Sequence, residues 1–223
     1  MISVILAGGG RGKRIGKKVP KSFLKINRKY LFLYSLEKFN SLSEVKEIIL
    51  ILPGERITPD LKNKLMKRFS KLKNIVEGGR ERQDSVYKGL KYIDEKTEII
   101  LVHDIARPFV SKKLIKKVIE GTRKYRACIP VTPSTDTLKV VEDNFVKKTL
   151  EREKIFRSQT PQGFLREILL KAYQKAKEEK IKCSDDSQLV ENTGIRVYTV
   201  EGERENIKIT FPIDLKIAEK LKK

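Results

Sequence analysis

Glycines and basic residues follow the first apolar segment of the chain. Residues 5–22 read ILAGGGRGKRIGKKVPKS and include no acidic residue. Glycine lets the backbone approach a ligand closely and turn successive N–H groups toward one anion, for which a phosphate is the natural ligand. Two cations, Arg14 and Lys21, follow this turn. Cations held near a phosphate in a poorly solvated cleft can stabilise the charge that grows during phosphoryl chemistry.

The glycine turn does not match two common phosphate-binding motifs. A Walker loop places a glycine five residues before the Gly-Lys pair, but Ala7 stands at that distance from Gly12. A GxGxxG motif starting with Gly8 and Gly10 would need a third glycine where Lys13 stands. We interpret the turn as a clamp for a nucleoside triphosphate, which carries about four negative charges. The alternative is a surface turn with solvated basic residues.

The motif VHDIARP supplies a second group of candidates, at the end of a predicted strand. A carboxylate at this edge of a sheet, beside a phosphate site, is well placed to hold a hard cation, so Asp104 is a candidate Mg²⁺ ligand. A helix cap or an ion pair with Arg107 is the alternative. His103, the one histidine of the chain, receives no chemical role, because a lone histidine is more often structural. Asp185 and Asp186 precede an apolar helical pattern, so capping explains at least one of them, and metal binding stays open.

The elements that must position these residues are apolar segments that alternate with helical patterns. Strands are expected at residues 2–7, 45–53, 74–79, 98–104, 127–133 and 196–202. Helices are expected at residues 31–40, 61–69, 85–93, 112–125 and 164–179. This order predicts an α/β fold, a Rossmann-like, mostly parallel sheet with helices on both faces. Ligands of such sheets bind beyond the carboxyl ends of the strands, where the glycine turn lies.

The alternation of strands and helices stops between Pro133 and Phe156. The stretch STDTLKVVEDNFVKKTLEREKIF alternates polar and apolar residues in the manner of a β-hairpin. We therefore expect a single domain over residues 1–223 with a projecting β-arm at about residues 134–156. The apolar positions of this arm need cover, and a neighbouring subunit is the simplest one, which predicts a homodimer.

The composition raises a different class of function. A formal charge of +21 first suggests a nucleic-acid partner. However, aromatic residues make up 7% of the chain, tryptophan is absent, and the excess is mostly lysine spread through helical patterns. We therefore favour solvated helix faces over a nucleic-acid surface. Two cysteines without a CxxC pair, no secretory signal and no apolar run of membrane-spanning length predict a cytoplasmic protein that binds no membrane.

The motifs also occur in a recognisable order. They are LAGGGRGKRI with PKS, GGRERQDSV, VHDIARP, TDTLK, TPQGF, SDDSQLVE and ENIKIT with PIDL. Together they resemble, over nearly the whole chain, the 2-C-methyl-D-erythritol 4-phosphate cytidylyltransferases of the non-mevalonate isoprenoid pathway. The resemblance implies transfer of CMP from CTP to this polyol phosphate, with Mg²⁺ as cofactor. The ribitol 5-phosphate cytidylyltransferases share most of these signatures, and a sugar nucleotidyltransferase using another NTP is a further alternative.

The resemblance implies roles for individual residues. Arg14 and Lys21 would stabilise the transition state, while Asp104, through Mg²⁺, and Arg107 would face the reacting phosphates. The nucleotide would contact Ala7, Gly8, Gly9, Gly12, Gly78, Gly79 and Ser85. The polyol phosphate would be positioned by Lys208, Thr137, Thr160 and, from the arm of the partner subunit, Arg152. The chain departs from the family pattern in a glycine loop one residue longer and in Ser22, where the family usually has glutamine.

Overall fold

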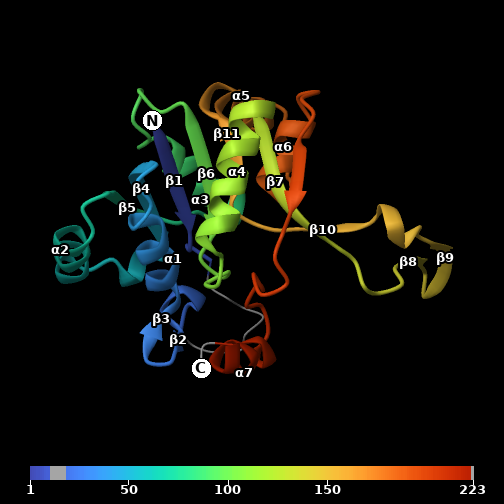
Figure 1. The fold of residues 1–223 in the computed structure, drawn as a ribbon, viewed down its shortest axis with the longest axis horizontal. Coiled ribbons are helices and arrows are strands. Elements are labelled where there is room, and N and C mark those ends of the chain that lie inside the picture. Colours follow the sequence, from blue (N-terminus) through green and yellow to red (C-terminus); the bar gives the residue numbers. More distant parts are fainter. Residues whose placement is uncertain (11–18, 222–223) are drawn as a thin grey trace.

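The computed structural model describes residues 1–10 and 19–221, and within them an eight-stranded sheet forms the centre of the molecule (Figure 1). Its strands follow the order β10-β7-β11-β6-β1-β4-β5, with β12 beside β7. They are β1 (Ile2–Ala7), β4 (Val45–Leu52), β5 (Leu72–Glu77), β6 (Ile99–Asp104), β7 (Ala127–Pro133), β10 (Phe156–Ser158), β11 (Gln162–Leu165) and β12 (Tyr198–Glu201). The pairs β1–β4, β1–β6, β4–β5 and β7–β12 are parallel, so the predicted, mostly parallel sheet is confirmed.

Helices cover both faces of the sheet. One face packs against α1 (Leu31–Asn40), α2 (Pro59–Arg68) and α4 (Lys112–Tyr125), and the other against α3 (Arg82–Leu90), α5 (Arg166–Glu178) and α6 (Asp186–Glu191). Successive strand residues point to opposite faces, so Val4 and Leu6 of β1 join the first core and Ile5 joins the second. In α4, Ser111 caps the first turn, accepting a hydrogen bond from the N–H of Leu114 at 2.9 Å.

The register of the parallel strands sets the edge where a ligand can bind. Ala7, the last residue of β1, pairs with Ile51 of β4 on one side and with Asp104, the last residue of β6, on the other. Because parallel strands end at the same edge, the loops after β1, β4, β5 and β6 converge there. The glycine turn and the carboxylate of VHDIARP are thereby brought together.

A small third core lies below this edge. It is formed around the short strands β2 (Lys25–Ile26) and β3 (Lys29–Tyr30) and the C-terminal helix α7 (Pro212–Leu221). Ile26, Ile209 and Leu215 are buried in it. This packing brings the segment after Pro20 beside the segment of Lys208, although the two are far apart in sequence.

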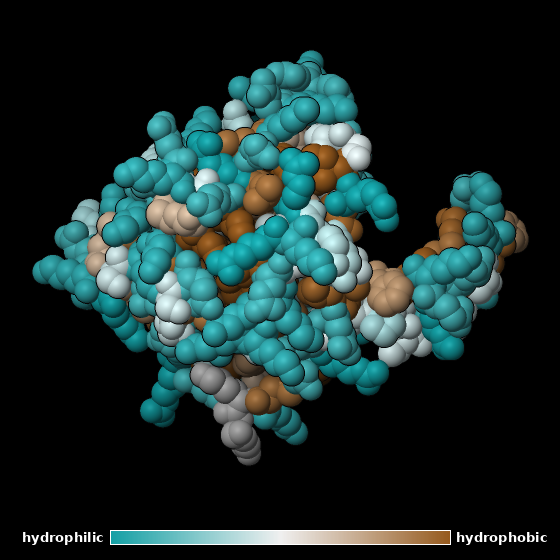
Figure 2. Space-filling model, turned by 45° about the horizontal axis from the view of Figure 1, so that its top comes forward, coloured by the Kyte–Doolittle hydropathy of each residue, from teal (hydrophilic) through white to brown (hydrophobic). Residues whose placement is uncertain are grey.

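A β-hairpin projects from the body of the molecule, as Figure 1 shows. It consists of the antiparallel strands β8 (Lys139–Glu142) and β9 (Phe145–Thr149), followed by the 3₁₀ turn η4 (Arg152–Lys154). The hairpin predicted at this place is confirmed. Its apolar side chains are open to solvent in the single chain, and Phe145 is 78% exposed. Figure 2 shows apolar surface on the protruding arm.

One predicted helix begins later than expected. The helical pattern was expected from Phe164, but Phe164 and Leu165 belong to β11, and α5 begins at Arg166. Phe164 is fully buried and pairs with Ile100 of β6 and Ala127 of β7, in antiparallel orientation to both strands. A strand of four residues is too short for periodicity to separate it from the helix that follows.

Among the described residues, no helix is both long and apolar enough to cross a membrane.

Candidate active site

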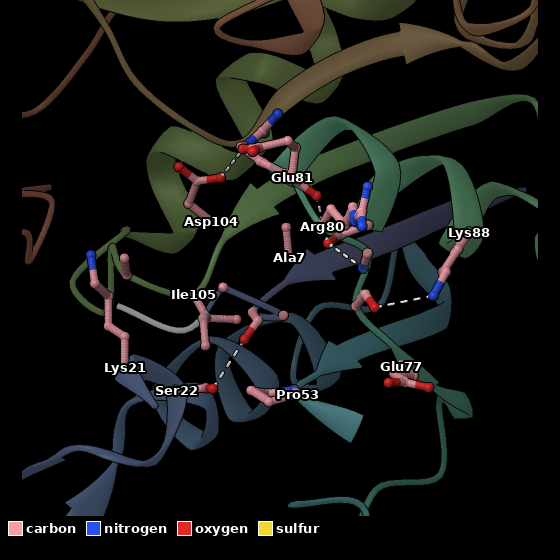
Figure 3. A pocket seen from close by; sticks show the side chains of 18 of the residues that line it. Ala7, Lys21, Ser22, Pro53, Glu77, Arg80, Glu81, Lys88, Asp104 and Ile105 are labelled. Atoms are coloured by element: carbon pink, nitrogen blue, oxygen red, sulfur yellow. Dashed lines mark hydrogen bonds and ion pairs between the residues drawn. The ribbon is translucent and has the colours of Figure 1, made fainter. Parts of the chain in front are cut away.

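A cleft of about 940 Å³ opens at the carboxyl edge of the sheet (Figure 3). Its walls come from the turn after β1, the loop between β5 and α3, and the end of β6. Lys21, from the segment before β2, and Lys208, from the segment before α7, also line it. The described part of the cleft therefore combines glycine backbone with cationic side chains, which suits a polyanion.

Two glycines let the loops on either side of the cleft touch. A Cβ atom on Gly9 would lie 2.6 Å from the Cα of Gly78, so only glycine permits this approach. The hydroxyl of Ser85 accepts a hydrogen bond from the N–H of Gly79 at 2.9 Å and donates to the carbonyl of Glu81 at 2.9 Å. These bonds fix the second loop in place. The cleft is lined by six residues predicted to bind the nucleotide: Ala7, Gly8, Gly9, Gly78, Gly79 and Ser85.

Lys21 lies on the opposite wall of the cleft, as Figure 3 shows. Its ammonium group donates a hydrogen bond to the carbonyl of Ile209 at 2.8 Å, which ties it to the segment of Lys208. The neighbouring hydroxyl of Ser22 is buried and donates to the carbonyl of Gly8 at 3.0 Å. This hydrogen bond joins the start of the glycine turn to the segment that contains Lys21. The predicted residues Gly12 and Arg14 lie outside the described residues.

Asp104 lies between two cations at the floor of the cleft. Its Oδ1 accepts a hydrogen bond from Nε of Arg82 at 2.8 Å, and its Oδ2 accepts one from Nζ of Lys208 at 2.6 Å. Burial alone would raise the pKa of Asp104, but the charges of Arg82 and Lys208 outweigh it and hold the pKa well below its usual range. The carboxylate is therefore ionised.

Arg107 does not form the ion pair considered as an alternative role for Asp104. Its guanidinium donates instead to the carbonyls of Asn206 at 2.7 Å and Ser158 at 3.0 Å. Arg107 is not among the described residues that line the cleft. In this structure it braces the loop after β6 against two other segments, and its contact with the reacting phosphates stays a prediction.

His103 is buried beneath the cleft in a neutral form. Its Nε2 donates to the carbonyl of Arg107 at 3.2 Å, so its Nδ1 must accept the hydrogen bond from the hydroxyl of Thr160 at 3.0 Å. The same hydroxyl accepts a hydrogen bond from the backbone N–H of Asp104 at 3.1 Å. Burial lowers the pKa of His103 to about 3. The two side chains thus hold the backbone of Asp104, and a contact of Thr160 with the acceptor stays a prediction.

Two predicted residues lie in the arm, away from the cleft of their own chain. Thr137 is exposed, and the side chain of Arg152 is 56% exposed in η4. Neither lines the described cleft. Their contact with the polyol phosphate stays a prediction.

The two adjacent aspartates before α6 have different environments. Asp185 is the N-cap, since its side chain accepts a hydrogen bond from the N–H of Gln188 at 3.1 Å, as capping predicts. Asp186 is fully buried and pairs with the guanidinium of Arg82 at 2.6 Å. Among residues 1–10 and 19–221, no group of three or more His, Cys, Asp or Glu side chains could hold a metal ion by itself.

The comparisons with known proteins agree with this geometry. Residues 1–223 match the family model of IspD, 2-C-methyl-D-erythritol 4-phosphate cytidylyltransferase. This chain belongs to that family. A 2-C-methyl-D-erythritol 4-phosphate cytidylyltransferase of Clostridium perfringens is 43% identical over 98% of this chain and 97% of its own length. A 2-C-methyl-D-erythritol 4-phosphate cytidylyltransferase of Caldanaerobacter subterraneus is 41% identical over 98% of this chain and 97% of its own length.

Solved structures of the family share the fold. The 2-C-methyl-D-erythritol 4-phosphate cytidylyltransferase of Thermus thermophilus superposes with a TM-score of 0.83 at 35% identity, over 98% of this chain and 97% of that one. The 4-diphosphocytidyl-2C-methyl-D-erythritol synthase of Anaerococcus prevotii superposes with a TM-score of 0.87 at 30% identity, over 100% of this chain and 96% of that one. The chain is thus a nucleotidyltransferase of the cytidylyltransferase class, and the resemblance inferred from the motifs is confirmed.

One charged residue in the cleft of this cytidylyltransferase that the sequence did not single out is Arg82. It lines the cleft and pairs with both Asp104 and Asp186. Burial alone would lower the pKa of its guanidinium, but the two carboxylates raise it well above its usual value. The signal was present, because Arg82 is the second arginine of GGRERQDSV. It received no role because its partners are distant in the sequence.

Proposed function

We propose that this chain carries out the reaction of its family in the cleft at the ends of β1, β5 and β6. A phosphate oxygen of 2-C-methyl-D-erythritol 4-phosphate attacks the α-phosphorus of CTP, and pyrophosphate leaves. The product is 4-diphosphocytidyl-2-C-methyl-D-erythritol. The observation that carries this proposal is the placement of closely packed glycine backbone together with Lys21, Arg82 and Lys208 in one cleft.

The side chains of the cleft suit a reaction that needs no general base. A phosphate monoester is already anionic at neutral pH, so positioning and charge neutralisation can carry the catalysis. The one histidine of the chain is held neutral and buried by two hydrogen bonds, consistent with a role in the scaffold. Lys21, with Arg14, balances the charge that grows at the α-phosphate. The turn of Gly78 and Gly79 with Ser85 holds the cytidine.

Mg²⁺ fits this cleft as a partner of the nucleotide. Magnesium sites of nucleotide enzymes commonly use one or two carboxylates together with substrate phosphates and water. Asp104 supplies one ionised carboxylate, and each of its oxygens has a second lone pair beyond the hydrogen bond that it already accepts. Bound there, Mg²⁺ would neutralise charge on the phosphates. A chelator should therefore abolish turnover, and added Mg²⁺ should restore it.

The arm supports a homodimer with shared active sites. Its exposed apolar side chains need cover, and Thr137 and Arg152 lie too far out on it to line the cleft of their own chain. In a homodimer, the arm of one subunit brings Arg152 to the acceptor phosphate in the cleft of the other. The cytoplasmic location expected from the sequence stays a prediction.

Pyrophosphate release tests this function. The purified protein is incubated with each of CTP, ATP, GTP and UTP, and with methylerythritol 4-phosphate or ribitol 5-phosphate as acceptor. We expect turnover with CTP and methylerythritol phosphate to exceed every other combination by at least about tenfold. A preparation of Lys21→Ala serves as the control for contaminating phosphatases. Preference for ribitol phosphate, or for another NTP, would overturn the proposal.

A further inference from the structure

A chain of charged and polar contacts leads from the cleft into the protein interior. Arg82, the first residue of α3, uses Nε for Asp104 in the cleft and its terminal nitrogen Nη2 for Asp186 behind it. The other oxygen of Asp186 accepts a hydrogen bond from the hydroxyl of Tyr173 at 2.6 Å. At the cleft end of this series of contacts, Lys208 forms an ion pair with Asp104. Four elements, α5, α6, α3 and β6, are joined in this way.

At the buried end of this series of contacts, the side chains are arranged to hold the guanidinium of Arg82. Asp186 is 0% exposed and Tyr173 is 3% exposed, so neither can contact a substrate in the cleft. The backbone N–H of Asp186 donates to Oε1 of Gln162 in β11 at 3.1 Å, which fixes the backbone that carries the carboxylate. A buried carboxylate is costly unless it is paired and hydrogen-bonded, and each oxygen of this one accepts a hydrogen bond, one from Arg82 and one from Tyr173.

We propose that Asp186 and Tyr173 are positioning residues for cytidylyl transfer, which act through Arg82 on Asp104 and Lys208. This inference rests on the function proposed above. Arg82 faces a cleft that receives a polyanion, and phosphates would draw an unrestrained guanidinium away from Asp104. The buried Asp186 holds Arg82 back, so that Asp104 and Lys208 keep one arrangement while the substrates bind and react.

The kinetic consequence follows from the kind of interaction that is lost. A variant with a loosened Arg82 keeps all the cationic charges of the cleft, so ground-state binding and the KM values should change little. Misplacement of a reacting group by about 1 Å can cost on the order of a hundredfold in rate, so kcat should fall. A residue that only stabilises the fold would lower the melting temperature without this loss of kcat in the folded enzyme.

Tyr173→Phe tests the inference, because it removes only the hydroxyl that donates a hydrogen bond to Asp186. Its matched control is Tyr87→Phe, because Tyr87 stacks on Tyr173 with ring centroids 6.1 Å apart but belongs to α3, whereas the hydroxyl that donates to Asp186 is that of Tyr173. We expect Tyr173→Phe to lower kcat about fivefold to tenfold with KM for CTP within about twofold. Tyr87→Phe should keep kcat within about twofold. Asp186→Asn should lower kcat further, by about tenfold to a hundredfold.

A double-mutant cycle separates positioning through Arg82 from an independent effect. In an Arg82→Gln background the chain of contacts is already broken, so Tyr173→Phe should lower kcat by less than about twofold more. Circular dichroism confirms that each variant is folded at the assay temperature. An unchanged kcat in Tyr173→Phe, an equal loss in Tyr87→Phe, or the same loss in both backgrounds would overturn the inference.

The cycle also distinguishes failure of this inference from failure of the proposed function. All variants are assayed with whichever of the two polyol phosphates the wild-type protein uses, so an error in the acceptor leaves the test intact. An active wild type with unaffected variants overturns the positioning role alone. A wild type inactive with both acceptors overturns the proposed function and this inference with it.

Discussion

His103 should make the stability of the fold depend on pH. The native imidazole is fully buried and has a pKa of about 3, whereas the ordinary value is 6.5. Burial is the largest cause, and the charge of Arg107 adds to it, while Asp104 partly opposes it. Because the native pKa is depressed, the unfolded chain binds a proton as pH falls through 6.5, but the native state does not until about 3. The free energy of unfolding should therefore decrease over this window.

The size of the effect follows from these two pKa values. Between pH 7.5 and pH 5, the unfolded histidine becomes protonated and the native one stays neutral, which costs about 2 kcal/mol of stability. The chain has one histidine, so no other side chain with an ordinary pKa titrates near pH 6.5. The dependence can thus be assigned to a single residue.

Urea denaturation at several pH values measures this dependence. The matched variant is His103→Asn, which lacks the titrating ring, so its unfolding free energy should fall by clearly less than the wild type's between pH 7.5 and 5. Carboxylates that titrate near pH 5 contribute equally to both proteins and cancel in the difference. The single imidazole should also give an NMR signal that does not shift in the native protein down to pH 5. Equal slopes in the two proteins, or a native imidazole that titrates near 6.5, would refute the reasoning.

Three further predictions concern the cleft and the arm. Lys21→Ala should lower kcat by about a hundredfold to a thousandfold with small changes in KM, because charge stabilisation in the transition state is lost; an unchanged kcat in steady-state assays would contradict this. Gly9→Ala should weaken CTP binding in calorimetry, since its Cβ would lie 2.6 Å from the Cα of Gly78 and push the two loops apart, and an unchanged affinity would contradict this. Mixed dimers of Arg152→Ala and Lys21→Ala subunits should regain activity that neither parent has, and heterodimers without recovery would exclude shared sites.

Much of the fold could be predicted because the strands are long and buried. Apolar segments such as Ile2–Ala7 and Ala127–Pro133 match the observed strands β1 and β7 at both ends. Once the sheet is parallel, the ends of β1 and β6 must lie together, so the meeting of Ala7 and Asp104 also follows from the sequence. At these positions the apolar pattern of each strand and the rule that parallel strands end at one edge of the sheet predict the same structure.

The contacts inside the cleft could not be predicted in the same way. Arg82 pairs with Asp104 and Asp186, which lie 22 and 104 residues away in the sequence. The spacing of these three residues does not predict the pairing. Asp104 was expected to hold Mg²⁺, with a helix cap or an ion pair with the nearby Arg107 as the alternative, because a sequence shows only the local neighbours of a residue. Packing of α3 and α6 on the same face of the sheet decides the pairing instead.

Ser22 shows how a departure from the family pattern acquires a physical reason only from the structure. From the sequence, the residue after Lys21 is only a shorter side chain where glutamine is usual. In the fold it is 0% exposed, and its hydroxyl reaches the carbonyl of Gly8. A buried carbonyl without a partner costs about 1–3 kcal/mol, so this bond favours the observed position of the turn. The small donor at position 22 therefore holds the start of the glycine turn against the segment that contains Lys21.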